Sequence, residues 1–434
     1  MITTVIADGK KEYDFIELLK SRAQNSDKNV IPIVSEIIEN VKTNGDKAVY
    51  DYTVKFDGKA PEKAEISADE IDAVISECDP KYIETVRKAA KNIEDFHKRQ
   101  VQQSWLTTKN NGVIMGQRIR GLKRVGIYVP GGTAAYPSSV LMNAIPAKIA
   151  GVEEIVMCTP PMKNGKPNPN ILAAAKLAGV DRIFLMGGAQ AIAAMAYGTE
   201  SVPKVYKIFG PGNQYVTAAK QLVSLRDVAI DMPAGPSEVE VLADETANPS
   251  FVAADLLSQA EHGADSQAIL VTTSPALQLA VKEEVERQLA LLPRKEIAEK
   301  SLANSKLIVV RNMDEAIELT NSYAPEHLII ETADYMSVAE RVVNAGSVFL
   351  GSLTPESAGD YASGTNHTLP TNGYAKAYSG VSLDSFIRKI TFQEIKPEGI
   401  RIIGPAIEEM AASEHLDAHK NAVTVRLDKL GVEN

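Results

Sequence analysis

Residues 183–190 read IFLMGGAQ, a short apolar strand that runs into a glycine turn just before an alanine-rich helical stretch. The same order of strand, turn and helix recurs after residue 126, through Gly131 and Gly132, and after residue 205, through Gly210 and Gly212. Short apolar strands that alternate with helices predict a mostly parallel sheet. Turns between strand ends and helix starts are where such sheets bind phosphates and dinucleotides. We therefore expect a Rossmann-like, nucleotide-binding domain over residues 126–236.

A second α/β half is expected over residues 237–384, because further apolar strands alternate with helical stretches there. These strands begin near Val239, Ala268, Leu307 and Leu328. Neither G-x-G-x-x-G nor G-x-x-x-x-G-K-[ST] occurs in the sequence, so both halves are expected to be incomplete Rossmann-like domains. The predicted fold class is α/β, with two parallel-sheet domains, a helical N-terminal region (1–125) and a C-terminal helical tail (385–434).

The N-terminal region is predicted to be helical because its apolar residues recur at helical spacing from about Asp14 to Gln100. His97 lies among Lys98, Arg99 and Gln100, which favours a solvated surface histidine. The role of this region stays open at this point.

The tail is predicted to end in one helix from about Pro405 to Val425. That helix would place His415 and His419 four residues apart on one face, a spacing that can hold a metal. His419 also falls in the apolar stripe that runs to Val423, which favours an inward His419, whereas any role of His415 stays open.

The composition is that of an ordinary globular chain with a sizeable core: 434 residues, 44% hydrophobic and 24% charged. A net charge of −10 argues against nucleic acid or an anionic membrane as the main partner and suits a small cationic substrate. No apolar run reaches membrane-spanning length, and charged residues occupy the place of a signal peptide's apolar core, so a cytoplasmic protein is expected. The two cysteines are too few for a disulfide framework, and Cys158, in an apolar strand, is expected to be a buried structural residue.

Polar residues near the predicted strands and helix ends offer a candidate site. Gln259 and His262 stand three residues apart at a helix end, so an amide and an imidazole share a face, although a satisfied helix end explains them equally well. Glu326 and His327 precede an apolar strand, and such a pair can serve two proton transfers. Asp360 lies in a long Gly- and Ser-rich run over 351–364, and long loops tend to be functional.

Eight segments in the same order resemble the histidinol dehydrogenase family over nearly the whole length of the chain, least distinctively in the N-terminal region. They are GIYVPGG (126–132), GGAQAIAA (187–194), FGPGN (209–213), DMPAGPSE (231–238), SQAEHG (258–263), YAPEHL (323–328), SAGDYASGTNHTLPT (357–371) and EHLDAHKNAV (414–423). Together they are far more specific than any single glycine-rich turn.

The resemblance implies an enzyme of histidine biosynthesis that oxidises L-histidinol to L-histidine through a bound aldehyde, with two NAD used in succession. It implies one zinc ion per subunit, held by Gln259, His262, Asp360 and His419, and a proton-transfer pair, Glu326 and His327. It also implies NAD contacts at Tyr128, Gln190 and Asn213, and a homodimer in which His419 and Glu414 reach the partner's site. The implied substrate contacts are Ser237, Gln259, His262, His327, Asp360, Glu414 and His419.

Three alternatives remain open on the sequence. A related zinc- and NAD-dependent dehydrogenase could act on another small alcohol, although Glu414 argues against an anionic substrate. A zinc hydrolase could use Glu326 or His327 to activate water without a nicotinamide, although the glycine turns and Tyr128 argue for one. A binding protein without catalysis is disfavoured, because every position that catalysis requires is occupied.

Overall fold

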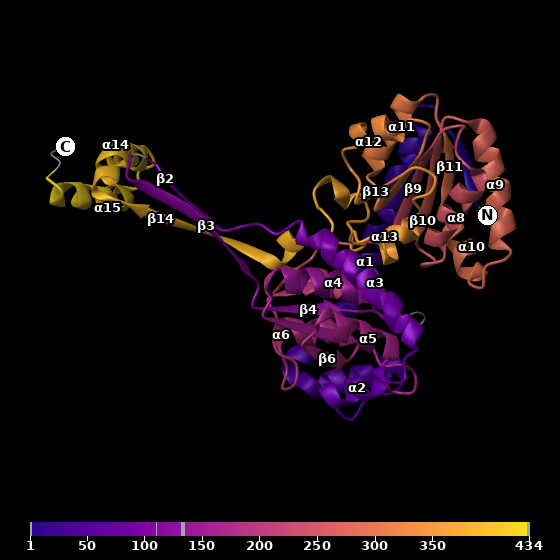
Figure 1. Cartoon of the computed structure of the whole chain (residues 1–434), viewed down its shortest axis with the longest axis horizontal. Coiled ribbons are helices and arrows are strands. Elements are labelled where there is room, and N and C mark those ends of the chain that lie inside the picture. Colours follow the sequence, from indigo (N-terminus) through magenta and orange to yellow (C-terminus); the bar gives the residue numbers. More distant parts are fainter. Residues whose placement is uncertain (1, 110, 132–134, 432–434) are drawn as a thin grey trace. The chain divides into compact units, whose positions relative to one another are not determined.

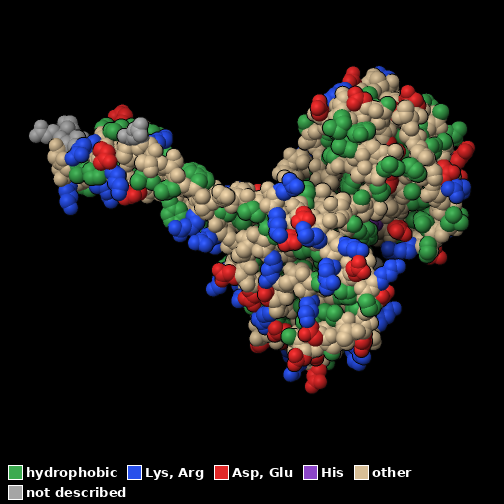
Figure 2. Space-filling view, viewed as in Figure 1, with side chains coloured by type: hydrophobic (Ala, Val, Ile, Leu, Met, Phe, Trp, Pro, Cys, Tyr) green, Lys and Arg blue, Asp and Glu red, His purple; other side chains and the backbone are tan. Residues whose placement is uncertain are grey.

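The computed structural model describes residues 2–109, 111–131 and 135–431, with the side chains of 19–28 excluded. The chain forms two compact units (Figure 1). Unit 1 consists of Met1–Gln100 and Leu122–Phe386, and unit 2 consists of Val101–Gly121 and Ile387–Asn434. Basic and acidic side chains are interspersed over the visible face of unit 1 (Figure 2), as expected for 46 basic and 56 acidic residues.

The first sheet of unit 1 has five parallel strands in the order β6-β5-β4-β7-β8. Nearly all of their apolar residues are buried, as a sheet covered on both faces requires. The strands are β4 (Arg124–Tyr128), β5 (Glu154–Thr159), β6 (Arg182–Leu185), β7 (Lys207–Phe209) and β8 (Ala229–Ile230), and the helices between them are α4 (Pro137–Ile149), α5 (Pro169–Ala178), α6 (Gly188–Tyr197) and α7 (Gln214–Ser224). The strand order reverses between β4 and β7, because the chain adds β5 and β6 on one side of β4 and then β7 and β8 on the other. Such sheets bind ligands at a reversal of this kind, at the carboxyl ends of the strands.

The second sheet has six parallel strands in the order β1-β11-β10-β9-β12-β13, which confirms the expected α/β class. Its strands are β1 (Thr3–Ile6), β9 (Glu238–Ala243), β10 (Gln267–Thr272), β11 (Lys306–Val309), β12 (His327–Glu331) and β13 (Ser347–Leu350). Its helices are α8 (Pro249–Ala260), α9 (Pro275–Leu289), α10 (Lys295–Ala303), α11 (Met313–Tyr323), α12 (Tyr335–Arg341) and α13 (Glu356–Tyr361), with short 3-10 turns at Tyr374–Lys376 and Leu383–Phe386 farther along the chain. The edge strand β1 comes from the region expected to be helical; its four residues are mostly exposed and carry no clear periodic pattern.

The N-terminal helices pack on the first sheet's helices. Helix α1 (Lys11–Asp57), interrupted at Gly45, lies against α6 and α7, while α3 (Pro80–Lys98) lies against α4. Helix α2 (Ala68–Ile75) begins with the capping box formed by Ser67 and Glu70.

The expectation of a solvated His97 is wrong. The side chain is fully buried, and its Nδ1 lies 2.8 Å from the carbonyl oxygen of Ile93. Its charged sequence neighbours point elsewhere, because His97 continues the buried face of α3 that carries Val86 and Ile93.

Unit 2 combines a three-stranded antiparallel sheet, in the order β14-β3-β2, with two helices. Its elements are β2 (Trp105–Thr108), β3 (Val113–Gly121), β14 (Ile387–Ile395), α14 (Pro397–Ser413) and α15 (Asp417–Lys429). None of the helices in the described ranges of the chain combines the length and apolar character of a membrane span.

The single tail helix expected over 405–425 is in fact two helices. The break falls at His415, whose φ of 58° is left-handed and cannot continue a helix. The expectation that His415 and His419 share one helical face is therefore wrong. His419 is exposed within unit 2 rather than turned inward, and Glu414 is exposed as well.

Candidate active site

The carboxylate of Glu326 is buried at the amino end of β12, between that strand and β9. Its Oε2 accepts the backbone N–H of Glu238 at 3.0 Å, and the Ser237 hydroxyl also hydrogen-bonds to it. Burial raises the pKa of Glu326 to about 7. A carboxylate that is held by a backbone donor and titrates near neutrality is suited to accept and return a proton.

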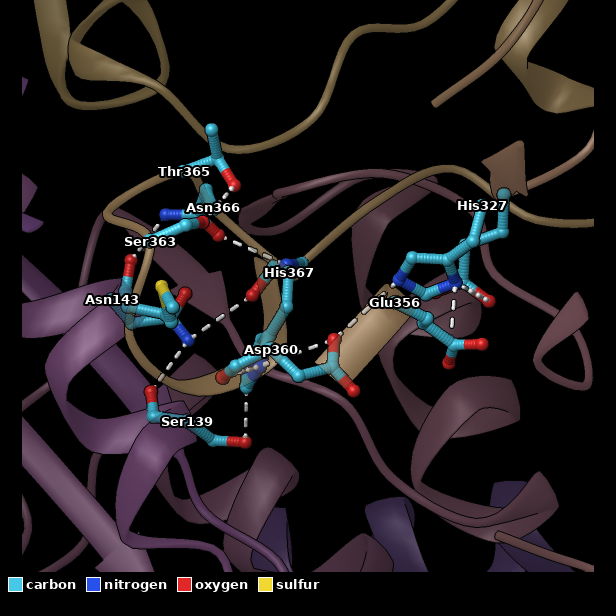
Figure 3. A network of polar contacts seen from close by, with 12 residues as sticks. Ser139, Asn143, His327, Glu356, Asp360, Ser363, Thr365, Asn366 and His367 are labelled. Atoms are coloured by element: carbon cyan, nitrogen blue, oxygen red, sulfur yellow. Dashed lines mark hydrogen bonds and ion pairs between the residues drawn. The ribbon is translucent and has the colours of Figure 1, made fainter. Parts of the chain in front are cut away.

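His327 is surrounded by acidic groups (Figure 3). Its Nδ1 lies 3.2 Å from the carbonyl oxygen of Glu238 and 3.8 Å from carboxylate oxygens of both Glu326 and Glu356, while its Nε2 lies 3.5 Å from Oδ1 of Asp360. Burial alone would lower the pKa of His327, but the three carboxylates outweigh burial and raise it to about 10. Burial raises the pKa of Glu356 to about 8.

Three possible metal ligands lie close together beside Glu326 and His327. Ligand atoms of His262, Glu356 and Asp360 all lie within 4.8 Å of one another. Gln259 is fully buried near the end of α8, and neither its amide oxygen nor its nitrogen has a hydrogen-bond partner among the described residues. Unpartnered buried amides are costly, so a ligand for Gln259 is expected.

Glu356 was not singled out from the sequence. It precedes Asp360 by four residues on α13, so both carboxylates lie on one helical face. That i, i+4 spacing was the available signal, and it was hidden because the segment reads as a loop rich in Gly and Ser.

The chain after Asp360 is anchored to α4 of the first sheet (Figure 3). His367 lies with Nδ1 3.0 Å from the Asp360 carbonyl oxygen and Nε2 3.4 Å from the Ser139 hydroxyl. Asn366 donates to the Met142 carbonyl oxygen at 2.6 Å. His367, whose role the sequence left open, thus positions the Asp360 segment.

The three residues expected to contact NAD line one cavity of about 500 Å³ at the carboxyl ends of β4 and β7. Tyr128 accepts the Gly188 N–H at 3.1 Å through its hydroxyl oxygen, and Asn213 caps the start of α7. Gln190 is fully buried, and both its amide atoms lack a partner within the described part of the chain. The turn expected at Gly132 lies outside the described residues.

A buried ion pair holds the turn before Asn213. Lys220 Nζ lies 2.5 Å from Asp231 Oδ1 and donates to the Gly210 carbonyl oxygen at 2.8 Å, while Asp231 Oδ2 accepts the Gly210 N–H at 2.9 Å. Gly210 has φ of 110°, and a Cβ there would lie 2.0 Å from the Tyr128 carbonyl oxygen. Only glycine fits this close approach of the two strand ends.

The candidate metal ligands and the substrate contacts are thus divided. Most of them belong to unit 1, namely Gln259, His262, Asp360, Ser237, Glu326 and His327. Unit 2 contains the other two, Glu414 and His419. Unit 1 thus contains three candidate ligands, Gln259, His262 and Asp360, and a zinc-like site with three protein ligands is open for further ones.

A parallel α/β chain with a cavity at its strand-order reversal, a buried acid–base pair and an adjacent group of possible metal ligands has the architecture of an α/β enzyme. Similarity to known proteins identifies the family within that class. The family model described as histidinol dehydrogenase matches residues 20–427. The chain belongs to the histidinol dehydrogenase family and is an oxidoreductase.

Several relatives resemble the chain over nearly its whole length. A histidinol dehydrogenase of Bacteroides thetaiotaomicron is 67% identical over 414 residues, which cover 95% of this chain and 96% of that protein. One from Clostridium acetobutylicum is 49% identical over 427 residues, covering 98% and 99%. The crystal structure of histidinol dehydrogenase from Elizabethkingia anophelis matches with a TM-score of 0.92 and 49% identity, covering 99% of each chain.

Proposed function

We propose that this protein oxidises L-histidinol to L-histidine through a bound aldehyde, using two NAD in succession and one zinc ion per subunit. The observation that carries the proposal is the buried Glu326–His327 pair, which lies directly beside the group formed by His262, Glu356 and Asp360. Two oxidations at one carbon need two proton acceptors and a fixed substrate, and this arrangement offers both.

Gln259, His262 and Asp360 are the residues of unit 1 that would hold the zinc ion, with His419 as the fourth ligand. Two imidazoles, a carboxylate and an amide oxygen form a donor set that zinc accepts, and the unpartnered amide of buried Gln259 supports this assignment. A zinc ion held by these residues would supply a positive charge to orient the substrate and polarise its reacting oxygen.

His327 is the base that takes the alcohol proton. Its Nδ1 faces the Glu238 carbonyl oxygen, so Nδ1 keeps its hydrogen, and Nε2 is the nitrogen that accepts a proton once the ring is neutral. If Asp360 binds a cation, the positive charge of the cation offsets that of the carboxylate. The pKa of His327 then falls, because Asp360 no longer stabilises the imidazolium.

Glu326 is the base for the second oxidation, in which water adds to the aldehyde. A pKa of about 7 lets its carboxylate take a proton from water near neutral pH, and the backbone N–H of Glu238 keeps its Oε2 in place. Ser237 is the further substrate contact beside it, and the acidic surroundings suit a substrate that carries an ammonium group.

Tyr128, Gln190 and Asn213 are the NAD contacts. The pair of unpartnered amide atoms on Gln190 and the cavity at the strand-order reversal support this assignment. NAD held by these residues would supply the hydride acceptor for each oxidation.

The working unit is a homodimer in which Glu414 and His419 complete the partner's site. Both side chains are exposed within unit 2, which is a separate compact unit, and such units can be exchanged between subunits.

The direct test is NAD reduction with L-histidinol, measured before and after chelation and again after zinc is restored. We expect activity to follow zinc content, with His262→Asn losing the metal and Asp265→Asn, an exposed neighbour, retaining one zinc per chain. Full activity in protein that elemental analysis finds metal-free would refute the zinc assignment. Absence of NADH formation with L-histidinol would refute the substrate assignment.

A further inference from the structure

The cavity that holds Tyr128, Gln190 and Asn213 is also lined by Asp57, the last residue of α1. Helix α1 ends directly after it, at Gly58 in the left-handed conformation. Oδ2 of Asp57 is buried, and none of the described residues offers it a hydrogen bond. Its carboxylate is near enough to the Tyr128 hydroxyl to raise the pKa of that group further, beyond the effect of burial.

The position of Asp57 is unfavourable for an isolated protein in two ways. A helix C-terminus carries partial negative charge, which destabilises a carboxylate at its last residue. Burial without a partner adds a desolvation cost and raises the pKa of Asp57 to about 6. The group is still mostly ionised above neutral pH, so it is a strong acceptor without a donor. A ligand with hydroxyl donors would offset both costs.

The first sheet lacks an acidic residue where dinucleotide-binding sheets commonly carry one. In such sheets an Asp or Glu beyond the glycine turn, about 20 residues on, accepts hydrogen bonds from a ribose of the cofactor. Here the strand after the turn at Gly131 is β5. The acidic residues about 20 positions past that turn, Glu153 and Glu154, lie at the amino end of β5, whereas its carboxyl end is followed by Pro160, Pro161, Met162 and Lys163, none of which can accept through a carboxylate. Pro160 lines the same cavity as Asp57.

We propose that Asp57 replaces this missing acid and binds the two adjacent hydroxyls of a ribose of the dinucleotide. The proposal rests on the NAD site of the proposed function and names a residue that contributes to it from α1, outside the sheet. A vicinal diol presents two donors that match the two oxygens of a carboxylate.

The charge of the cavity favours a ribose without a 2′-phosphate. Its charged lining residues are Glu36, Asp57 and Lys55, two acidic and one basic, which gives a net charge of −1. Lys55 is exposed, and its Nζ lies 5.4 Å from the centre of the Phe56 ring. A phosphate on the ribose would meet the Asp57 carboxylate and be repelled.

The experiment compares the zinc-loaded native protein with Asp57→Asn and with the control Asp51→Asn, by calorimetric titration with ADP-ribose and 2′-phospho-ADP-ribose. Asp51 is an exposed carboxylate on the same helix, 2.8 Å from Lys47, and it does not line the cavity. We expect Asp57→Asn to weaken ADP-ribose binding about tenfold or more and Asp51→Asn to leave it unchanged. A smaller gap between the two ligands in Asp57→Asn assigns the diol to the adenosine ribose, whereas equal weakening of both assigns it to the other ribose.

A second measurement separates binding from a structural role. Without nucleotide, the melting temperature of Asp57→Asn should equal or exceed that of the native protein, because the substitution removes an unpaired buried charge. The proposal is overturned if Asp57→Asn binds ADP-ribose as tightly as the native protein does. It is also overturned if Asp57→Asn binds ADP-ribose more weakly, melts at a lower temperature than the native protein, and regains that temperature with no ligand. If the native protein binds neither ADP-ribose nor NAD, the NAD site fails as well, which distinguishes the two failures.

Discussion

Replacing Lys220 by Met is expected to destabilise unit 1 strongly, because it leaves the Asp231 carboxylate buried without its counter-charge. The two side chains of this pair are only 6% and 1% exposed. Removing one partner of a buried ion pair typically costs about 3–5 kcal/mol, whereas replacing both partners with neutral groups costs much less. The Gly210 carbonyl oxygen also loses its donor in this variant. Asp231 keeps the backbone N–H donors of Gly210 and Met232, so a value near the lower limit is expected.

The assay is a double-mutant cycle in urea, followed by circular dichroism, with Lys220→Met, Asp231→Asn and the double variant. The double variant should recover most of the stability that either single variant loses. The matched control is the exposed pair of Lys47 and Asp51, whose coupling should remain below about 0.5 kcal/mol. A loss under about 1 kcal/mol for Lys220→Met, or single losses that simply add in the double variant, would refute the reasoning.

Three further predictions concern the proposed chemistry, the proposed subunit exchange and a buried acid. Glu326→Gln should lower aldehyde oxidation about a hundredfold or more while retaining more of the aldehyde reduction, as measured by separate assays of the two half-reactions, and equal losses would contradict the assigned role. His419→Asn and His262→Asn, each inactive alone, should recover about a quarter of native activity after subunit exchange, and recovery no greater than the sum of the separate variants would exclude a shared site. Burial raises the pKa of Glu240 to about 8, so the folded state binds more protons than the unfolded chain and native stability falls as pH rises from about 4.5 to about 8. Glu240→Gln should therefore raise the free energy of unfolding, measured by urea titration, by at least about 1 kcal/mol at pH 8.5 and change it little at pH 5. The same gain at both pH values would contradict this account.

The parallel sheets could be predicted from the sequence because their strands are buried on both faces. Such strands appear as continuous apolar runs, as in 155–158 and 268–271. Strands β1 and β14 escaped prediction because most of their side chains are exposed, so neither apolar runs nor alternation mark them. The break at His415 also escaped, because a non-glycine residue in the left-handed region leaves little trace in composition.

Candidate residues that are close in sequence could be grouped from their spacing alone. Gln259 and His262 share a helix end, and Glu326 and His327 are adjacent, so short-range spacing was sufficient to group them. Asp57 and Tyr128 are distant in sequence and line one cavity only because α1 packs on α6 and α7. Contacts of that kind depend on tertiary packing, which no local pattern encodes. Whether Glu414 and His419 complete the site stays a prediction.

The edge strand β1 also has a consequence for the order in which the chain becomes structured during synthesis. Thr3 pairs with Lys306, so β1 leaves the ribosome well before its partner strand, which lies 303 positions later in the sequence. The first sheet, by contrast, has all its strands between residues 124 and 230, and α1 can dock on α6 and α7 as soon as they emerge. Closing so long a loop is entropically costly and slow, and domains fold as they are completed. The second sheet therefore acquires its edge late, and a nascent chain that ends before about residue 310 exposes β1 as an unpaired strand.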